Sequence, residues 1–412
     1  MAASMMQRGL TREQALAAAA QAIERAGGVS MEATMEVPGL FHTPTFNLGF
    51  FHESNITITD RLKATLGLRY DYTNVKVHYE TSAAMAMTAH VMGQAATNVL
   101  SSVLDNRHHD NYNQLLPKVG LTYSIGNNGS NVYATVSKGY RAGGFNIQMF
   151  SDILQTELDN PDYRAQANRQ SVDIPHTDED YERMRKTISY KPETSWNYEF
   201  GTHLNLFNGQ MQADLAGFYM QVQDQQLSVM AGNYGFGRMM VNAGKSYSCG
   251  VEAALRGNLF DNHLMWALTY GYTHAVFKEY DDEEVVNGIP VVVSYKDKRV
   301  PFVPEHTFAA NADYRFNVTT LGMKSITLGL NVTGQGKTYW DELNKYEQKI
   351  YALLGAHMDA DWKNVSLSVW GRNLTDTNYN TFAVESVIQN ETKLFAQRGN
   401  PLQVGVDFRW RF

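Results

Sequence analysis

The last twelve residues of the chain, Pro401 to Phe412, alternate between apolar and polar side chains. This period of two predicts a β-strand, because successive side chains of a strand point to opposite faces. Such a strand suits the wall of an outer-membrane β-barrel, with lipid on one face and a wet lumen on the other. It also suits an edge strand of a soluble β-sandwich, so the choice between the two folds depends on whether the same pattern recurs along the chain. The apolar face carries Leu402, Val404, Val406, Phe408, Trp410 and Phe412.

The same alternation recurs in about thirteen segments of the length that a barrel wall needs. One example places Leu66, Leu68 and Tyr70 on one face and Gly67, Arg69 and Asp71 on the other. The segments begin near Phe46, Leu62, Leu121, Val132, Trp196, Leu215, Val251, Leu264, Phe308, Ile326, Leu354, Val365 and Leu402. We therefore predict that residues 44–412 form an all-β, antiparallel transmembrane barrel wall.

Short and long connections alternate strictly between these segments. The short ones fall at residues 59–60, 126–130, 208–209, 261–262, 319–324 and 363–364, and are rich in residues that accept tight turns. The long, polar ones fall at residues 80–111, 145–192, 231–240, 281–300, 338–348 and 380–394. Outer-membrane barrels have short periplasmic turns and long extracellular loops, whereas a sandwich does not require this alternation. The connections thus favour a barrel.

Aromatic residues gather near both ends of the predicted strands, as the two girdles of a membrane barrel require. One set lies toward the long connections: Tyr70, Tyr72, Trp196, Tyr198, Tyr270 and Tyr272. The other set lies toward the short turns: Phe207, Phe260, Trp362, Trp410 and Phe412.

The composition excludes several other classes of protein. The net charge is -7 and no long basic run occurs, which argues against nucleic acid as a partner. A single cysteine cannot form a disulfide within the chain. No eighteen successive apolar residues occur and the mean hydropathy is -0.37, so a helical membrane protein is excluded.

Residues 1–43 precede the predicted wall and contain one short predicted helix, residues 11–27. Thr11 can cap it, Gln14 stands at the capping-box position, and Gly27 and Gly28 end it. Charged residues interrupt the apolar ones, so no export signal is visible. If Phe412 ends on the periplasmic side, counting back makes the first strand run inward from outside. We therefore interpret residues 1–43 as an extracellular-loop remnant and the chain as the back part of a longer barrel.

Five motifs, taken in order, resemble the C-terminal barrel portion of TonB-dependent outer-membrane receptors. They are Ser-Lys-Gly-Tyr-Arg-Ala-Gly-Gly-Phe at 137–145, Lys-Pro-Glu-Thr-Ser-Trp-Asn-Tyr-Glu-Phe-Gly at 191–201, Gly-Val-Glu-Ala at 250–253, Val-Pro-Phe-Val-Pro-Glu-His at 300–306 and Gly-Arg-Asn-Leu-Thr-Asp-Thr-Asn-Tyr at 371–379. The chain also ends on Phe412, as members of that family do. Trp410 and Phe412 would then form the signal that the barrel-assembly machinery recognises.

The resemblance implies a receptor in the outer membrane of a Gram-negative bacterium, surrounded by lipid. Its barrel is the 22-stranded, plugged kind, so roughly nine strands and the plug would be missing here. Such a receptor takes up an iron-siderophore, haem, cobalamin or a glycan when the TonB complex pulls on its plug. Two alternatives remain open, a plug-less passive channel and a non-functional truncated fragment. An odd strand number argues against the channel.

Five residues are candidates for ligand binding, because they lie where strands should meet outer loops. They are Tyr140, Arg141, Tyr339, Trp340 and Arg398. Arginine beside aromatic rings suits planar, anionic or sugar ligands through stacking and bidentate hydrogen bonds. The alternative at each position is a girdle aromatic or an arginine that pairs with an acid of the wall.

Neither a metal site nor an enzyme is predicted. His108, His109 and Asp110 have ligand types, but neighbouring residues of a strand point to opposite sides, and a solvated loop cluster is the preferred interpretation. The acidic run at 281–284 is typical of a solvated loop. No nucleophile elbow or spaced metal signature occurs, so no catalytic residue and no cofactor are expected.

Overall fold

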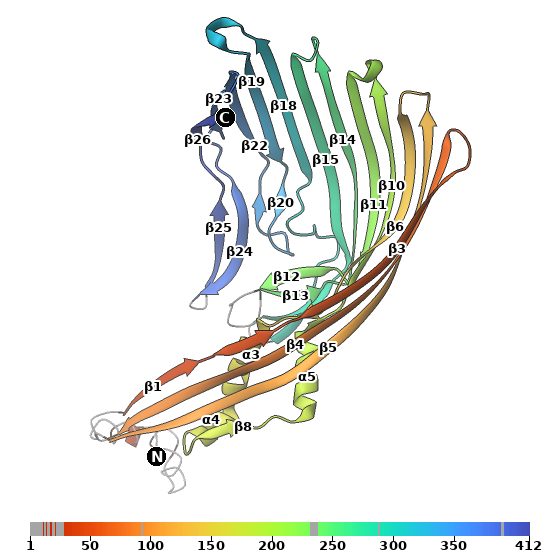
Figure 1. The fold of residues 1–412 in the computed structure, drawn as a ribbon. Helices are drawn as coiled ribbons and strands as arrows, with labels where there is room; N and C mark the ends of the chain where they lie inside the picture. The colour runs from red at the N-terminus through yellow and green to blue at the C-terminus, as the bar shows by residue number, and fades with distance from the viewer. Residues whose placement is uncertain are drawn as a thin grey trace.

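The computed structural model is an open, curved antiparallel sheet that carries a helical lobe at one end (Figure 1). It describes residues 11, 14, 17, 18, 21, 29–91, 94–230, 238–286, 289–388 and 391–412. Within these residues no helix is long and apolar enough to cross a bilayer.

Thirteen strands form the wall, each antiparallel to the next, as predicted. The bounds are β3 (Thr45–Thr57), β4 (Leu62–Val91), β5 (Gln94–Ile125), β6 (Ser130–Arg141), β10 (Glu193–Leu206), β11 (Met211–Gln223), β14 (Lys245–Leu259), β15 (Leu264–Glu279), β18 (His306–Asn317), β19 (Ser325–Gln335), β22 (Tyr351–Asp361), β23 (Val365–Arg372) and β26 (Gln403–Trp410). The sheet is not closed, and β3 and β26 stand at its opposite edges (Figure 1).

The six predicted short turns are all present at one end of the wall, near the C-terminus (Figure 1). Their tight geometry comes from residues in the left-handed region, such as Gly126 (φ 64°), Gly209 (φ 85°) and Asn262 (φ 67°). Two of them contain one 3₁₀ turn each, η1 (Phe207–Gly209) and η2 (Thr320–Gly322). Glycine and asparagine tolerate positive φ, which explains why composition alone located these turns.

The convex face of the wall is apolar and exposed, as a lipid-facing surface requires. Phe200 is 65% exposed and Val404 75% exposed, although both are in regular strands. Both predicted girdles are on this face, with Tyr70 and Trp196 toward one end and Phe260 and Trp410 toward the other. Polar residues occupy the concave face, because side chains alternate along each strand.

Residues 29–42 form two strands, β1 (Val29–Glu36) and β2 (Gly39–His42), which pair with the far half of β4. Farther upstream, Gln14, Ala17, Ala18 and Gln21 are helical. The Thr11 hydroxyl accepts from the amide of Gln14 at 3.3 Å and the Gln14 side chain accepts from the amide of Thr11 at 3.2 Å, which is the predicted capping box. Gly27 and Gly28 lie outside the described residues. The division at residue 44 stays a prediction.

The long connection predicted at residues 80–111 is present, and it is not irregular, because β4 and β5 continue through it as one hairpin. Their ladder runs without a break from Leu62 opposite Tyr123 to Val91 opposite Gln94. Beyond Thr73 the concave face of this hairpin becomes apolar, and it carries Val75, Val77, Tyr79, Ala83, Met85, Met87, Leu100 and Leu104. The polar residues therefore lie on the opposite, convex face, which explains why this segment looked like a loop.

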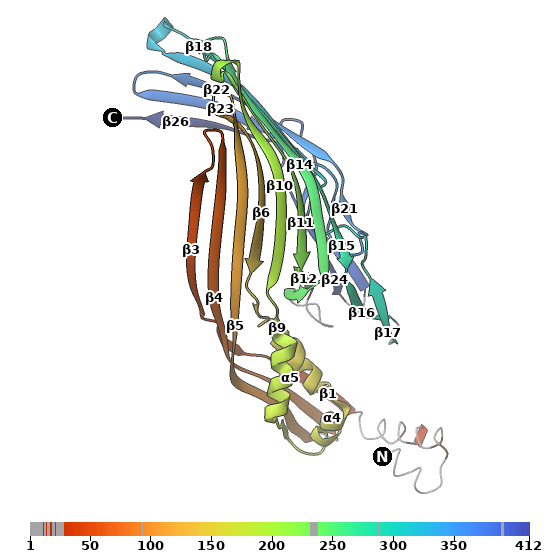
Figure 2. The same cartoon turned by 90° about the vertical axis from the view of Figure 1, so that its right-hand side faces the viewer.

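Three helices cover this apolar face, and all come from the predicted connection at 145–192 (Figure 2). They are α3 (Met149–Leu158), α4 (Pro161–Ala167) and α5 (Asp178–Ile188), with β8 (Val172–Ile174) added to the edge of β5. Phe150, Leu154 and Ile188 are at most 1% exposed in the resulting core. We call residues 75–110 and 144–190 together the outer lobe. A short pair, β7 (Gly144–Phe145) and β9 (Ser189–Tyr190), joins it to the wall.

The remaining outer connections are β-hairpins. They are β12 (Gln226–Met230) with β13 (Arg238–Asn242), β16 (Asp281–Val286) with β17 (Ile289–Ser294), β20 (Thr338–Tyr339) with β21 (Glu347–Gln348), and β24 (Asn380–Ile388) with β25 (Glu391–Arg398). The acidic run at 281–284 lies in a strand of one of these hairpins, β16, and its interpretation as part of a solvated loop stays a prediction. Buried Phe277 packs with stacked Tyr280 and Tyr295, whose ring centroids are 4.6 Å apart, in a second outer core.

Candidate functional site: concave wall and outer rim

A connected set of polar side chains crosses four neighbouring strands on the concave face. The Tyr133 hydroxyl donates to Glu199 at 2.7 Å, and the Tyr133 ring stacks on His203 with centroids 5.1 Å apart. His203 Nδ1 lies 2.7 Å from Asp214, which also pairs with Arg256 at 3.1 Å. The register explains this contact, because His203 is directly opposite Asp214. The set is therefore positioned by the ladder itself.

This polar set borders a hollow of about 610 Å³ on the concave face. Its volume is in the range of sites for small molecules. Further polar side chains from β14, β15, β18 and β19 line it, namely Glu252, Thr269, Thr307, Thr333 and Gln335. The concave wall thus offers donors, acceptors and both signs of charge.

Other charged side chains of the concave face also make contacts along it. Arg69 Nε lies 2.8 Å from Asp71 on one strand, and His357 Nε2 lies 3.5 Å from Asp313 across two strands. Asp407 accepts a hydrogen bond from the Trp370 indole at 2.9 Å instead. Cross-strand contacts of this kind stabilise a sheet.

The five predicted ligand-binding residues fall into two separate groups. Tyr140 and exposed Arg141 end β6, and the Tyr140 hydroxyl donates to Thr73 at 3.0 Å. Tyr339, Trp340 and Arg398 lie on the outer hairpins near β22 and β23. Seven wall strands, β10, β11, β14, β15, β18, β19 and β22, separate β6 from β23. The described structure does not bring the two groups together.

Trp340 of the second group belongs to an aromatic row that the sequence did not reveal. Phe302 lies between Trp340 and Phe382, with ring centroids 5.6 and 5.7 Å away. Nearby, Tyr351 stacks on Tyr379 at 4.6 Å. Phe302 was within the motif at 300–306, but only the pairing of outer hairpins places it beside a tryptophan. We call Phe302, Trp340 and Phe382 the rim aromatics.

Arg398 is exposed on β25 and its guanidinium donates to the Asn378 side chain at 2.9 Å. The neighbouring motif at 371–379 forms a fixed turn. Asn373, at φ 49°, is 5% exposed and its amide donates to the carbonyl oxygens of Thr377 and Asn400. The motif therefore shapes the rim, and ligand binding by Arg398 stays a prediction.

The outer lobe contains buried titratable groups as well. His108 is 8% exposed and accepts from the Tyr79 hydroxyl over 3.1 Å when the imidazole is neutral, so the preferred solvated loop cluster is wrong. Burial lowers the pKa of His108, because an imidazolium would lose water contacts there. Neighbouring Asp110 pairs with Arg185 of α5 at 3.0 Å. The strand geometry does point His108 and His109 to opposite faces, as expected.

A second hollow of about 630 Å³ lies among the helices of the lobe. His176 and Glu157 face it and are 3.1 Å apart, and Glu157 also accepts from Ser102 at 2.6 Å. Burial raises the pKa of Asp152 on the same wall. No sequence motif marked this hollow, because its residues are scattered over three helices and a strand.

The predicted assembly residues lie on the convex face, at the end of the wall that carries the short turns. Trp410 is opposite Val365 in the ladder and is 62% exposed, and its ring meets that of Phe412 edge-on with centroids 5.7 Å apart. Their place on the lipid-facing side is compatible with the predicted role, which stays a prediction.

A model of the TonB-dependent receptor-like β-barrel family matches residues 33–374, which are 342 of the 412 residues. The chain belongs to this family. Its members are transporters of the Gram-negative outer membrane, so the predicted location and the prediction that the chain is not an enzyme are confirmed.

Solved structures support the same fold. The siderophore receptor PiuA from Acinetobacter baumannii is 14% identical with a TM-score of 0.56, over 90% of this chain and 56% of that receptor. The ferric yersiniabactin uptake receptor FyuA from Yersinia pestis is 19% identical with a TM-score of 0.53, over 93% and 55%. The ferric-catecholate import receptor Fiu from E. coli K12 is 16% identical with a TM-score of 0.55, over 90% and 45%. The chain therefore spans about half the length of these receptors.

Proposed function

We propose that this chain forms the C-terminal wall of a receptor that takes up an iron-siderophore complex across the outer membrane. The observation that carries the proposal is the concave wall, which presents a polar hollow behind an outer rim of aromatics and arginines. The three receptors of similar fold are named for siderophores or ferric complexes, which favours this ligand class over haem, cobalamin or a glycan. Energy would come from the TonB complex, acting through a plug inside the barrel.

Closure of the wall needs additional strands in this proposal. Thirteen antiparallel strands make β3 and β26 run in the same direction, so these two edges cannot complete an antiparallel barrel by pairing with each other. An open edge in lipid leaves backbone groups unpaired at a cost of several kcal/mol each. About nine further strands would give the 22-stranded form. Trp410 and Phe412 would guide insertion by the barrel-assembly machinery.

Ligand capture would begin at the rim. A ferric siderophore is often anionic and carries planar chelating groups, which suit stacking on the rim aromatics and hydrogen bonds from Arg398. Arg141 and Tyr140 would approach from the other side of the lumen once the barrel closes. Tyr339 lies under the Lys337 ammonium, 5.2 Å from it, which adds a second cation beside the aromatic row.

Uptake of radioactive iron by the native bacterium under iron limitation tests this proposal. Ferric-catecholate and ferric citrate complexes are supplied in turn to cells with and without the gene, and to cells without TonB. We expect saturable uptake that requires both the gene and TonB. Arg398→Gln should lower uptake about tenfold, the loss of one charged hydrogen bond, whereas Arg61→Gln at a short turn is the matched control.

Two outcomes would reject the proposal in different ways. Uptake that does not saturate and persists without TonB would identify a passive channel. Iron uptake that is the same with and without the gene would exclude iron transport altogether.

A further inference from the structure

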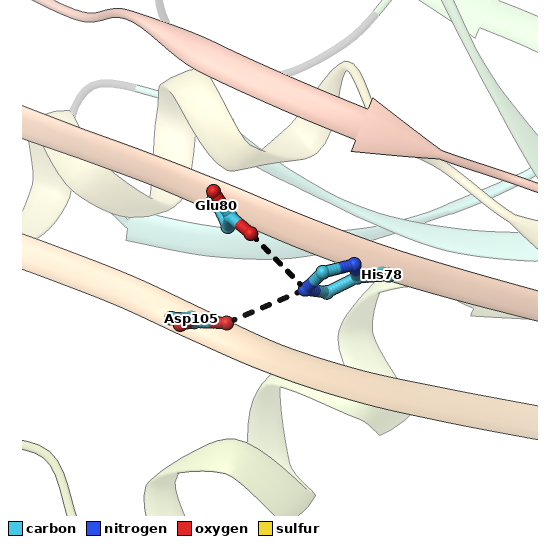
Figure 3. A group of neighbouring side chains, drawn as sticks. All are labelled: His78, Glu80 and Asp105. Carbon is cyan, nitrogen blue, oxygen red and sulfur yellow. Dashed lines mark ion pairs between the residues drawn. The ribbon is translucent and has the colours of Figure 1, made fainter.

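Three side chains with metal-ligand atoms meet on the convex face of the outer lobe. Figure 3 shows the imidazole of His78 facing the carboxylates of Glu80 and Asp105. His78 Nε2 lies 3.4 Å from Glu80 Oε1 and 3.6 Å from Asp105 Oδ1. One ligand atom from each residue lies within 4.8 Å of the other two. This cluster lies on the opposite face from the apolar core, since it occupies the alternate positions of β4 and β5.

The backbone ladder fixes this arrangement. His78 and Glu80 are two residues apart on β4 and therefore share a face, and Glu80 is directly opposite Asp105 on β5. Both strands are regular on either side of the cluster. A loop would have to be ordered by a ligand, whereas these three residues are placed before any ligand arrives.

The spacing suits a small divalent cation. A direct N–H···O hydrogen bond spans about 2.7–3.2 Å, which is shorter than either distance here. Two ligand atoms that are each about 2.0–2.2 Å from a tetrahedral zinc ion stand roughly 3.3–3.6 Å apart. The observed separations of 3.4 and 3.6 Å match this value. Direct contacts between His78 and the two carboxylates, without an ion, are the competing account.

A fourth ligand is available from the next strand. His42 of β2 is exposed and is directly opposite His78, so both imidazoles stand on the same face. Directly opposed residues have Cβ atoms about 4.5–5.5 Å apart, within reach of one ion after a change of side-chain rotamer. A hollow of about 540 Å³ lies beside the cluster, and Glu80 and Asp105 help to line it, whereas His78 and His42 do not.

Neighbouring positive charges oppose cation binding, namely Arg107 and Lys76, which is two residues from His78 on the same face of β4. Arg107 is directly across the ladder from His78 and shares its face. The guanidinium of Arg107 repels a divalent ion, and it also provides a test. Removal of this charge should strengthen binding of the ion, whereas removal of a distant positive charge should not.

We propose that His78, Glu80 and Asp105, completed by His42, bind one zinc ion on the outer surface of the lobe. Imidazole and carboxylate ligands in a four-coordinate site suit zinc. The ion joins β2, β4 and β5 and so ties the N-terminal strands to the lobe. This site does not depend on the proposed uptake function, because it faces away from the concave wall.

The test is zinc titration of the full folded chain in detergent, followed by calorimetry and by the visible spectrum of the cobalt-substituted protein. We expect one ion per chain. His78→Gln, Glu80→Gln and Asp105→Asn should each weaken binding by about 10–100-fold, as losses at metal sites do. Arg107→Gln should tighten it. His90→Gln is the matched control, since His90 is an exposed histidine on the same strand and the same face.

Circular dichroism of each variant establishes that it is folded before the titration. Binding that is equal in the wild type and in folded His78→Gln would overturn the proposal. Absence of binding by the wild-type chain at millimolar zinc would also overturn it and would leave the account of direct contacts without an ion.

Discussion

The wall and the outer lobe share two strands, β4 and β5, but these strands have opposite hydrophobic patterns in the two regions. In the wall part of β4, Leu66 and Leu68 face outward and Arg69 and Asp71 face inward. Past Thr73 the apolar side chains, such as Val77, face inward and the polar ones face outward. The strand geometry does not change along this length, whereas the surroundings do, because lipid gives way to water outside and packed helices replace the lumen inside. Alternation of apolar and polar side chains therefore identifies a strand, and the face that carries the apolar ones identifies the medium that each face meets.

The largest expected effect is a loss of stability when a phenylalanine is removed from the lobe core, compared with one removed from the lipid face of the wall. Phe150 is 1% exposed in the lobe and its ring lies 4.2 Å from that of Tyr79, so Phe150→Ala should cost about 3–5 kcal/mol of lobe stability. Phe200 of the wall is 65% exposed on the lipid face, and Phe200→Ala should cost much less. Hydrogen exchange of residues 75–110 and 193–206 measures both. Equal protection of the lobe before and after Phe150→Ala would mean that its helices do not stabilise the hairpin.

The next effect tests whether the convex face meets lipid along the wall and water along the lobe. Leu68→Lys puts a charge on the convex face where it meets lipid and should cost about 2–4 kcal/mol if Leu68 lies near the bilayer midplane. Val103→Lys puts the same charge on the convex face of the lobe, where Val103 is 62% exposed, and should be nearly neutral. Urea unfolding in lipid vesicles compares the two variants. Similar costs would show that both positions meet the same medium.

The smallest effect concerns pH. Burial keeps the pKa of His108 below its usual value near 6.5, so the unfolded lobe takes up a proton first as the pH falls. Lobe stability should therefore be complete above about pH 6.5 and decrease as the pH falls through the folded pKa. Glu182 and Asp110 oppose this shift, and Arg185 and His109 reinforce it.

Hydrogen exchange of the lobe between about pH 7.5 and about pH 5.5, corrected for intrinsic rates, measures this dependence. His108→Gln keeps an acceptor for the Tyr79 hydroxyl and should remove part of the pH dependence. An unchanged slope in this variant would assign the pH dependence to other groups.

The sequence predicted the wall well, because in lipid each strand must satisfy its backbone through its neighbours and alternate its side chains. All thirteen strands and the six short turns followed from these two rules and from residues such as Gly209 and Asn262. The extension of β4 was missed because residues 83–89 are rich in alanine and methionine, which have low strand propensity. Its strand conformation depends on the helices and the partner strand.

The candidate site was predicted less completely for a related reason. Arg141, Trp340 and Arg398 were recognised as residue types at strand ends, but their neighbours depend on contacts between hairpins far apart in sequence. Phe382 of β24 reaches Phe302 only because the turn before β18 lies against an outer hairpin. His42, His78 and Asp105 are similarly distant in sequence, and only the register of β2, β4 and β5 aligns them.

The uninterrupted ladder of β4 and β5 has a mechanical consequence. At about 3.3 Å per residue, the thirty residues of β4 span roughly 100 Å, of which a bilayer occupies only about a third. The hairpin is therefore a continuous lever anchored in the membrane, although Figure 2 shows that it bends between the wall and the lobe. A sideways push on the outer lobe is carried as torque along this ladder to β3 and β6, the wall strands with which the membrane part of the hairpin pairs.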